Sequence, residues 1–339
     1  MATTLIVTVT LIEQIYPHPN ADRLEIAHIL GWQVVIPKGA HYAGQKVVYF
    51  PPDSVLPPEV SDRFGVTQYL NRGRVRAARL RGEYSFGFAV PPDNPDWEVG
   101  ENVAEYYGAT KYEPPIRPIA GDAEHSHPLF VSYTDIENLR NFLDVLTPGE
   151  PVVISEKIHG TNCRLGIIEG EWMAGSMGVR RKRPEEDQMH LNTYWYPYTL
   201  PAVRALVEQV AQNHRQGILF GEVYGSKIQS FHYGLENRLG FAAFDFFVDG
   251  RFLDWSEFAA LCQQFDLPTV PVLYEGPYSL EVVRRSSEGK TIFPDSHIRE
   301  GVVVRPSRER MDPRLGRAIL KYLGDAYLFD DKKTDFTDR

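Results

Sequence analysis

The sequence predicts an α+β protein of two domains, a small N-terminal β-barrel and a larger domain of antiparallel sheets with flanking helices. The length of 339 residues is too great for one small core and suits two domains. Residues 1–105 alternate short apolar runs with Pro/Gly turns, which is typical of a small barrel. Beyond them, most strand candidates precede turns, so the βαβ rhythm of a doubly wound fold is absent.

The N-terminal domain, residues 1–105, has strand candidates at 5–11, 31–36 and 46–50. The segment 18–25, His-Pro-Asn-Ala-Asp-Arg-Leu-Glu, resembles the opening of tRNA-binding-type OB-fold domains. That resemblance implies an OB-type barrel that binds nucleic acid. A basic cluster follows, and alone it fits a solvated face as well as a phosphate-binding one. Its members are Arg72, Arg74, Arg76, Arg79 and Arg81.

A linker is expected at residues 106–130, because three prolines fall within 114–118 and no periodicity is present. The second domain, residues 131–339, should begin with a helix. Thr134 is a suitable N-cap, Glu137 completes a capping box, and apolar residues then recur at helical spacing up to Leu146. Pro148-Gly149 would end this helix.

The rest of the second domain mixes strands and helices, and residues 329–339 should form a polar tail. Strand candidates are 152–156, 163–168, 218–223, 240–248, 301–304 and 318–323, and helix candidates are 200–213, 255–265 and 280–287.

Composition narrows the function classes. The net charge of −9 argues against a protein coated in nucleic acid, although a basic run at 180–183 remains. The two cysteines, Cys163 and Cys262, have no metal-type spacing, so a bound metal would have carboxylate ligands, as Mg²⁺ or Mn²⁺ prefers. No apolar run of membrane length and no charged leader are present, so we expect a cytoplasmic protein without membrane contact.

Chemistry is indicated by Lys157, which lies at the end of an apolar strand in the sequence Glu-Lys-Ile-His-Gly-Thr-Asn, residues 156–162. A lysine becomes a nucleophile where neighbouring cations or burial lower its pKa from about 10.4. The K-x-x-G pattern alone is common by chance, and a surface lysine would explain it. Four later segments also have ordinary explanations when each is taken singly: F-G-E at Glu222, A-F-D at Phe244, E-G-V-V at Glu300 and L-K at Lys321.

Together and in this order, the five segments resemble the nucleotidyltransferase motifs of covalent ligases and mRNA capping enzymes over residues 130–330. Capping enzymes and DNA ligases usually have Asp where His159 stands, so the first motif looks like the RNA ligase version. An OB domain that precedes the catalytic domain resembles the Naegleria/Deinococcus-type ATP-dependent RNA ligases.

The resemblance implies an enzyme that joins RNA 5′-phosphate and 3′-OH ends, in a nicked duplex, through a covalent lysyl-AMP and an RNA-adenylate. Lys157 would be the nucleophile that carries AMP from ATP, and Lys321 would neutralise charge on the phosphates. Glu222 and Glu300 would bind Mg²⁺ or Mn²⁺, and Phe244 would stack on adenine.

Four further residues are expected at the nucleotide. Glu156 would accept from the adenine amino group or orient Lys157, and His159 would lie near the phosphates or serve only the turn. Asn162 and Arg164 would contact ribose or phosphate.

Two motifs depart from the family pattern. Relatives have Ser-Arg where this chain has Ser176-Met177, which leaves the phosphate-contacting arginine in the 176–183 region unassigned. The last motif lacks a second lysine beside Lys321, and Arg317 is the candidate for that cation. Alternatives are a DNA ligase, a GTP-using capping enzyme or a non-catalytic tRNA- or RNA-binding module. A monomer is expected.

Overall fold

The computed structural model describes residues 5–113, 122–226 and 228–328. The chain forms two compact units, the first from Met1–Glu113 with Glu137–Leu143 and the second from Pro114–Ile136 with Asp144–Arg339. Most of the proline-rich part of the expected linker, residues 114–121, and the expected polar tail at 329–339 lie outside the described residues. Within the described part, no helix is both long and apolar enough to cross a membrane.

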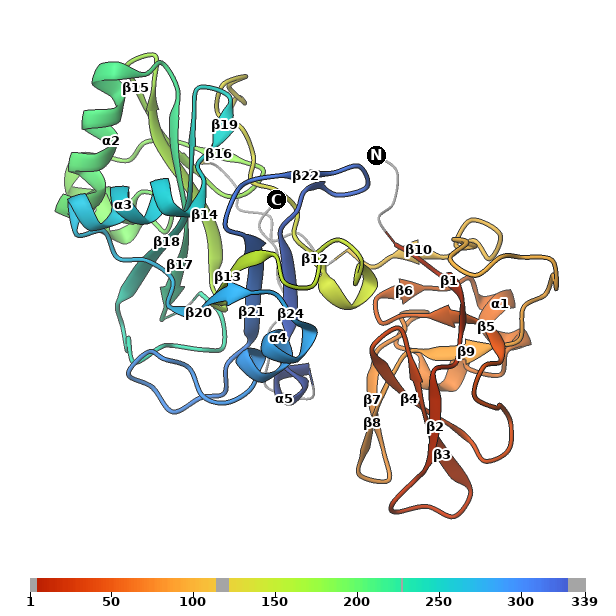
Figure 1. Cartoon of the computed structure of the whole chain (residues 1–339). Coiled ribbons are helices and arrows are strands. Elements are labelled where there is room, and N and C mark those ends of the chain that lie inside the picture. The colour runs from red at the N-terminus through yellow and green to blue at the C-terminus, as the bar shows by residue number, and fades with distance from the viewer. Residues whose placement is uncertain (1–4, 114–121, 227, 329–339) are drawn as a thin grey trace. The chain divides into compact units, whose positions relative to one another are not determined.

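The first unit is built from short antiparallel strands joined by tight turns (Figure 1). One sheet has the order β1-β5-β9 and another β2-β3-β4, and β6 pairs with β10 while β7 pairs with β8. Its core is apolar, with Phe50 and Phe88 stacked at a centroid distance of 4.7 Å. The elements are β1 Thr8–Leu11, β2 Gln14–Pro17, β3 Leu24–Ile29, β4 Trp32–Pro37, β5 Lys46–Phe50, β6 Ser54–Val55, α1 Pro58–Arg63, η1 Thr67–Tyr69, β7 Ala77–Leu80, β8 Glu83–Phe86, β9 Phe88–Val90 and β10 Thr110–Lys111.

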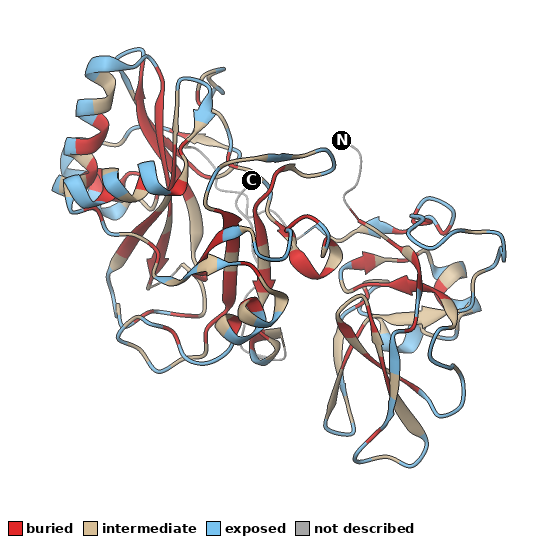
Figure 2. Ribbon diagram, in the orientation of Figure 1, coloured by how far each residue is buried: buried red, intermediate tan, exposed pale blue. Residues whose placement is uncertain are grey.

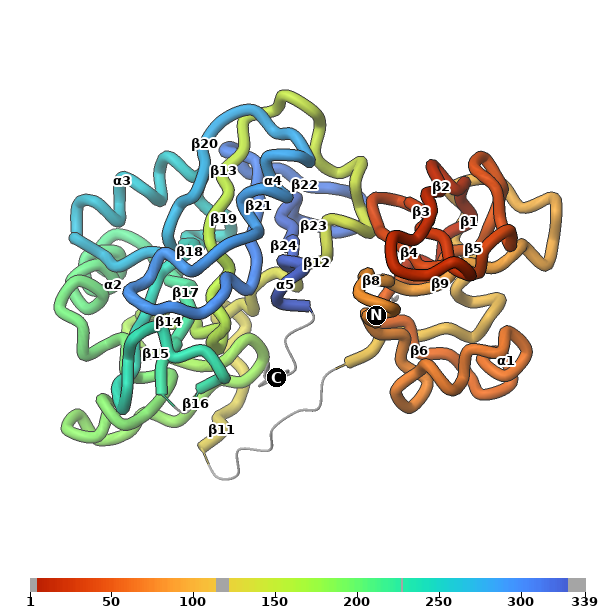
Figure 3. Tube along the Cα trace, turned by 90° about the horizontal axis from the view of Figure 1, so that it is seen from below, coloured from red at the N-terminus to blue at the C-terminus, as the bar shows by residue number. Residues whose placement is uncertain are grey.

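The second unit contains a seven-stranded sheet of order β11-β16-β15-β14-β17-β18-β19. Helices α2 and α3 lie on the same side of this unit, as Figures 1 and 3 show, and their apolar residues pack on β14, β17 and β18. The strands are β11 Ala123–Glu124, β14 Thr161–Ile168, β15 Glu171–Gly175, β16 Arg180–Arg181, β17 Gly217–Gly225, β18 Leu239–Val248 and β19 Arg251–Phe252. The helices are α2 Pro201–Asn213 and α3 Trp255–Phe265, preceded by the 3-10 turns η3 Glu186–Leu191 and η4 Tyr196–Thr199.

A second sheet of this unit places β24, β21, β13 and β20 side by side. Apolar residues from it, including Val303 and Ile319, pack against Ile218 and Phe220 of the seven-stranded sheet. Strands β13 and β21 are mostly buried, whereas β20 and the outer faces of the helices are more exposed (Figure 2). The remaining elements are β13 Pro151–Glu156, β20 Val272–Pro277, α4 Leu280–Ser287, β21 Gly301–Pro306, β22 Met311–Asp312, β23 Gly316–Arg317, β24 Leu320–Leu323 and α5 Asp325–Leu328.

The expected α+β class is confirmed, and the helices α2, α3 and α4 fall where the sequence predicts them. The helix expected from Thr134 to Leu146 is wrong. This segment forms β12, Glu137–Asn138, and the 3-10 turn η2, Leu139–Asn141. The capping box does not form, because the Glu137 carboxylate pairs with Lys111 at 2.5 Å and the Asn138 side chain accepts from the Arg140 N–H instead.

Candidate active site

A largely apolar pocket lies in the second unit, between the strand that ends before Lys157 and the strands that carry Glu222 and Phe244. Alternation along β13 places Val153 and Ser155 on the pocket wall, and Lys157 follows on the same side. The register brings distant motifs together, because Ser155 pairs with Val303 of β21 and Val303 pairs with Lys321 of β24. Residues lining the pocket include Tyr133, Asn162, Glu222, Phe244, Arg305, Ile319 and Lys321.

The amine of Lys157 is held by a carboxylate from the neighbouring strand. Its Nζ lies 2.8 Å from Oε1 of Glu300, and the Lys157 backbone N–H donates to the carbonyl of Gly301 at 3.0 Å. The Lys157 side chain is 27% exposed, whereas that of Glu300 is only 6% exposed. Although burial opposes ionisation, Lys157 and His159 lower the pKa of Glu300 to about 2. The structure therefore joins two predicted site residues in one ion pair.

Glu222 is the second carboxylate of the site, and its pKa is shifted in the opposite direction to that of Glu300. Burial raises the pKa of Glu222 to about 8; Lys157 lowers this pKa and Glu300 adds to the rise. A hydrogen bond from the Gly160 backbone also lowers it. Gly160 has to be glycine here, since a Cβ atom would lie 2.4 Å from the Val223 carbonyl oxygen and 2.7 Å from Cγ of Glu222. The glycine of the K-x-x-G motif thus permits the close approach of Glu222.

Phe244 enters the pocket through a β-bulge in β18. Phe220 pairs with Asp245 and the adjacent Gly221 pairs with Ala243, which leaves Phe244 as the extra residue. A bulge re-aims a side chain relative to regular alternation. The half-buried ring consequently faces the pocket rather than the outer side of the sheet.

Asn162 also lines the pocket, opposite Glu222 in the ladder of β14 and β17. Its Oδ1 is buried and has no hydrogen-bond partner among the described residues. A buried polar atom without a partner is costly in a native protein. Its position in the pocket therefore favours a ligand that supplies the missing hydrogen bond.

His159 does not line the pocket. The imidazole is 6% exposed and packs edge-on against Phe231 and Tyr327. Its Nδ1 lies 3.3 Å from the Tyr327 hydroxyl and 3.7 Å from Oε2 of Glu300. The imidazole of His159 therefore lies beside the carboxylate that pairs with Lys157, and the expected contact with the phosphates stays a prediction.

The Glu156 carboxylate is hydrogen-bonded within the protein, although Glu156 is among the residues that line the pocket. Oε1 accepts from the Thr291 hydroxyl at 2.5 Å, Oε2 accepts from the Ile292 N–H at 2.9 Å, and Arg299 Nε lies 3.6 Å away. The reason is alternation along β13, which turns the side chain of Glu156 opposite to Ser155 and Lys157. In the structure described, both carboxylate oxygens of Glu156 accept from protein donors, and Glu156 anchors the strand end that precedes Lys157. The expected contact with adenine stays a prediction.

Arg164 and Arg317, two expected ligand contacts, are committed to the protein interior. Arg164 is 4% exposed, its Nε donates to the Ser176 carbonyl at 2.9 Å, and another N–H donates to the Phe130 carbonyl. Burial lowers the pKa of Arg164 to about 10. Arg317 pairs with Asp245 at 2.7 Å and with Glu309 at 2.8 Å. Neither side chain lines the described pocket, and both have the internal acceptors that buried guanidinium groups need. The expected contacts of Arg164 and Arg317 with the ligand stay predictions.

The basic run 180–183 is largely neutralised. Arg180 pairs with Glu124 at 3.0 Å and Arg181 with Asp122 at 2.7 Å, while Arg183 pairs with Glu186 at 3.2 Å. Met177, where relatives have arginine, lines the pocket. The arginines of this run are therefore not arranged around the pocket.

Some residues that line the pocket were not singled out from the sequence. Ser155 and Val303 follow from strand alternation around Lys157 and Glu300, so alternation was the available signal. Tyr133 and Arg305 reach the pocket only through tertiary packing. Among the described residues, no group of three or more His, Cys, Asp or Glu side chains is arranged to hold a metal ion.

A lysine at a strand end, with two carboxylates and an aromatic ring nearby, between two antiparallel sheets, is the arrangement of a nucleotidyltransferase domain. The chain belongs to the RNA ligase family, whose family model, described as RNA ligase, matches residues 150–323. A second family model, described as an OB-fold domain, matches residues 6–92 and confirms the predicted barrel. No match was found among curated proteins.

Solved structures of Naegleria gruberi RNA ligase are similar to this chain over nearly its whole length. A variant with ATP and Mn is 25% identical, with a TM-score of 0.75 over 95% of this chain and 97% of that chain. A variant with AMP and Mn gives the same values. The ligase with PPi is 25% identical, with a TM-score of 0.73 over 96% and 98%. The predicted resemblance to Naegleria-type RNA ligases is thereby confirmed.

Substitution of Glu222 by Gln should change the pH dependence of stability. The folded pKa of about 8 exceeds the ordinary 4.5, so between these values the folded carboxyl keeps a proton that the unfolded chain has released. Its contribution to stability is therefore present at low pH and is lost as pH rises towards 8. Relative to wild type, Glu222→Gln should gain stability over this window, measured by urea unfolding at a series of pH values without nucleotide or metal. If the free energies of unfolding of wild type and Glu222→Gln changed with pH in the same way, a raised pKa of Glu222 would be contradicted.

Proposed function

We propose that this protein is an ATP-dependent RNA ligase that forms a covalent lysyl-AMP on Lys157. The observation that carries the proposal is the position of Lys157, whose Nζ is held 2.8 Å from Glu300 at a pocket lined by Phe244, Asn162 and Glu222. Family membership and the ATP- and AMP-bound state of the similar Naegleria gruberi structures support it.

The side chains that line the pocket suit the chemical groups of ATP. Phe244 offers an aromatic face, with Val303 and Ile319 as apolar neighbours, for the stacking of adenine. Asn162 offers a buried acceptor without a partner, which suits a hydroxyl of the ribose. Lys321, half-buried on the pocket wall, supplies positive charge for the phosphates.

Glu222 and Glu300 are the residues that would hold a divalent cation, Mg²⁺ or Mn²⁺. Two carboxylates fit this role, because Mg²⁺ is commonly bound by one or two carboxylates together with substrate phosphates and water. Such a cation, when bound, neutralises phosphate charge and competes with Lys157 for the Glu300 carboxylate.

The reaction proposed for this chain has three steps. Deprotonated Lys157 Nζ attacks the α-phosphorus of ATP, a P–N bond forms, and the bond to the β-phosphate oxygen breaks with release of pyrophosphate. The RNA 5′-phosphate then displaces Lys157 and becomes an RNA-adenylate. Finally the 3′-OH attacks the 5′-phosphorus, loses its proton, and AMP leaves. Lys321 neutralises charge that develops on the phosphates.

The substrate is proposed to be RNA with 3′-OH and 5′-phosphate ends in a nicked duplex. The OB-type domain, proposed at residues 1–105, would hold the strand opposite the nick, and the nucleotidyltransferase domain, proposed at 131–339, would carry the chemistry. Arg72, Arg76, Arg79 and Arg81 are exposed on the first unit, which suits contact with backbone phosphates. Arg74 is held by Asp53 at 2.7 Å and lies over Tyr112.

Incubation with α-labelled ATP and Mg²⁺ should label the wild-type protein, and Lys157→Ala should abolish the label. Lys157→Arg is the matched control for charge, since it keeps the pairing with Glu300 but lacks a comparable nucleophile; it too should remain unlabelled. Labelled GTP in parallel tests the capping-type alternative. A persistent label in Lys157→Ala would overturn the assignment of the nucleophile, and the absence of any wild-type label would favour a non-catalytic RNA-binding protein.

Sealing of a nicked duplex should depend on the sugar at the 3′ terminus of the nick. An RNA ligase should join a 3′ ribose end at least tenfold faster than a 3′ deoxyribose end, because the 2′-OH is the group that separates RNA from DNA. Two duplexes that differ only at that sugar are compared by gel under single-turnover conditions. Equal rates would support the DNA ligase alternative.

The double variant Arg79→Ala/Arg81→Ala should slow nick sealing and leave labelling of Lys157 unchanged. Both residues are exposed on the β7–β8 hairpin, so the loss concerns phosphate contacts, and the salt dependence of RNA binding should fall by about two units of slope. The control is Arg215→Ala/Arg251→Ala, which removes two exposed arginines of the second unit. An equal sealing defect in the control would show that net charge, rather than this surface, is responsible.

A further inference from the structure

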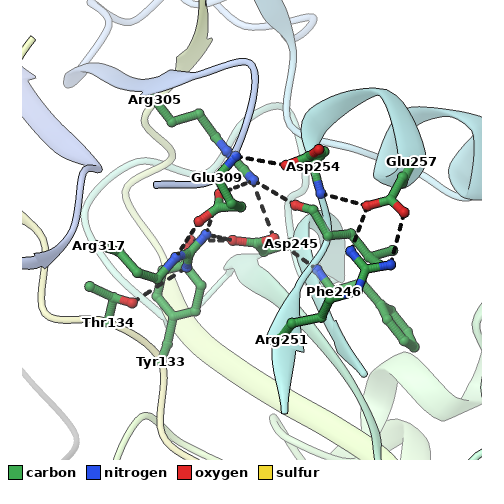
Figure 4. Close-up of polar contacts among 11 residues, drawn as sticks. Tyr133, Thr134, Asp245, Phe246, Arg251, Asp254, Glu257, Arg305, Glu309 and Arg317 are labelled. Carbon is green, nitrogen blue, oxygen red and sulfur yellow. Dashed lines mark hydrogen bonds and ion pairs between the residues drawn. The ribbon is translucent and has the colours of Figure 1, made fainter. Parts of the chain in front are cut away.

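The bulge at Phe244 is secured by its neighbour Asp245. The Asp245 side chain is fully buried, with Oδ2 accepting from Arg317 at 2.7 Å and Oδ1 lying 3.3 Å from Arg305 Nη1. Figure 4 shows this cluster, in which Glu309 pairs with both arginines. A buried carboxylate with two arginine partners resists displacement, since breaking either pair leaves an uncompensated charge. The backbone next to Phe244 is therefore fixed.

Tyr133 joins this cluster to the ring of Phe244. Its hydroxyl donates to Oδ2 of Asp245 at 2.9 Å, and its ring lies edge-on to Phe244 with a centroid distance of 4.9 Å and an interplanar angle of 62°. Tyr133 is 5% exposed and also packs against Phe220 and Phe252. Edge-to-face contacts of this kind hold an aromatic ring in one orientation.

We infer that Tyr133 is a positioning residue for nucleotide binding, which orients the Phe244 ring for stacking on the base. The hydrogen bond to Asp245 fixes the Tyr133 ring, and that ring in turn limits rotation of Phe244 about its side-chain bonds. The role rests on the proposed function, because Phe244 needs a fixed orientation only if a base stacks on it. Tyr133 itself takes no part in the transfer of AMP.

The test is equilibrium dialysis of the full-length protein with α,β-methylene-ATP and Mg²⁺, a probe that cannot transfer AMP. Tyr133→Phe keeps the ring and removes one buried hydrogen bond, so affinity should fall about fivefold. Phe244→Leu should reduce affinity further. The double variant should bind no more weakly than Phe244→Leu alone, because Tyr133 acts through the Phe244 ring.

Tyr198→Phe is the matched control. The Tyr198 hydroxyl is buried in the same unit, with its single proton shared between the carbonyls of Gly166 and Met173, each 2.8 Å away. Tyr198 does not line the pocket. Tyr198→Phe should lower the stability of the fold and leave the affinity for α,β-methylene-ATP unchanged. Unchanged affinity in Tyr133→Phe, or additive losses in the double variant, would overturn the inference while wild-type labelling of Lys157 stands. Failure of the wild type to bind the analogue or to become labelled would overturn the proposed function and the inference with it.

Discussion

The ion pair between Lys157 and Glu300 organises the site. A carboxylate that is 6% exposed is expensive to ionise unless a cation lies beside it, and Lys157 Nζ lies 2.8 Å away. Burial is the main cause of the raised pKa of Glu222; Lys157 opposes this rise, and the negative charge of Glu300 adds to it. The pKa of Glu300 falls to about 2 while that of Glu222 rises to about 8, so the two carboxyl groups of this structure differ in ionisation at neutral pH. The site is thereby prepared for added positive charge, which would allow both groups to ionise.

This charge arrangement depends on the register of two sheets. Lys157 follows the last residue of β13, Glu300 precedes the first residue of β21, and the two strands are antiparallel neighbours. The start of one strand therefore lies beside the end of the other, without any long loop to position either side chain. Glu222 comes from the other sheet, and Gly160 allows it to approach because no Cβ fits between them. Backbone hydrogen bonds hold these groups more rigidly than loops would.

Much of the site could be predicted from local sequence patterns, and what could not be predicted depends on contacts between distant segments. Lys157, Glu222, Phe244, Glu300 and Lys321 lie on or next to strands whose apolar pattern is clear. Four of them line the pocket, and Glu300 pairs with Lys157 beside it. The helix expected after Thr134 failed because local periodicity cannot show that Lys111 takes the Glu137 carboxylate. The internal partners of Arg164, Arg317 and Glu156 could not be foreseen for a related reason. Their acceptors and donors, such as the Phe130 carbonyl, Asp245 and Thr291, come from distant segments. The roles assigned to the five gathered residues stay predictions.

The arginines of the two units differ in how accessible they are to phosphate groups. In the second unit, Arg164, Arg305 and Arg317 are buried and bound to internal acceptors, and Arg180, Arg181 and Arg183 are paired with acidic residues. Lys157 and Lys321 are the cationic residues that line the described pocket apart from Arg305. Charge on a nucleotide triphosphate would then be balanced mainly by these two lysines and by the cation that Glu222 and Glu300 suit. In the first unit, four of the five clustered arginines are exposed. A chain with a net charge of −9 thus keeps this exposed arginine cluster on the domain proposed to bind RNA, apart from the domain proposed to transfer AMP.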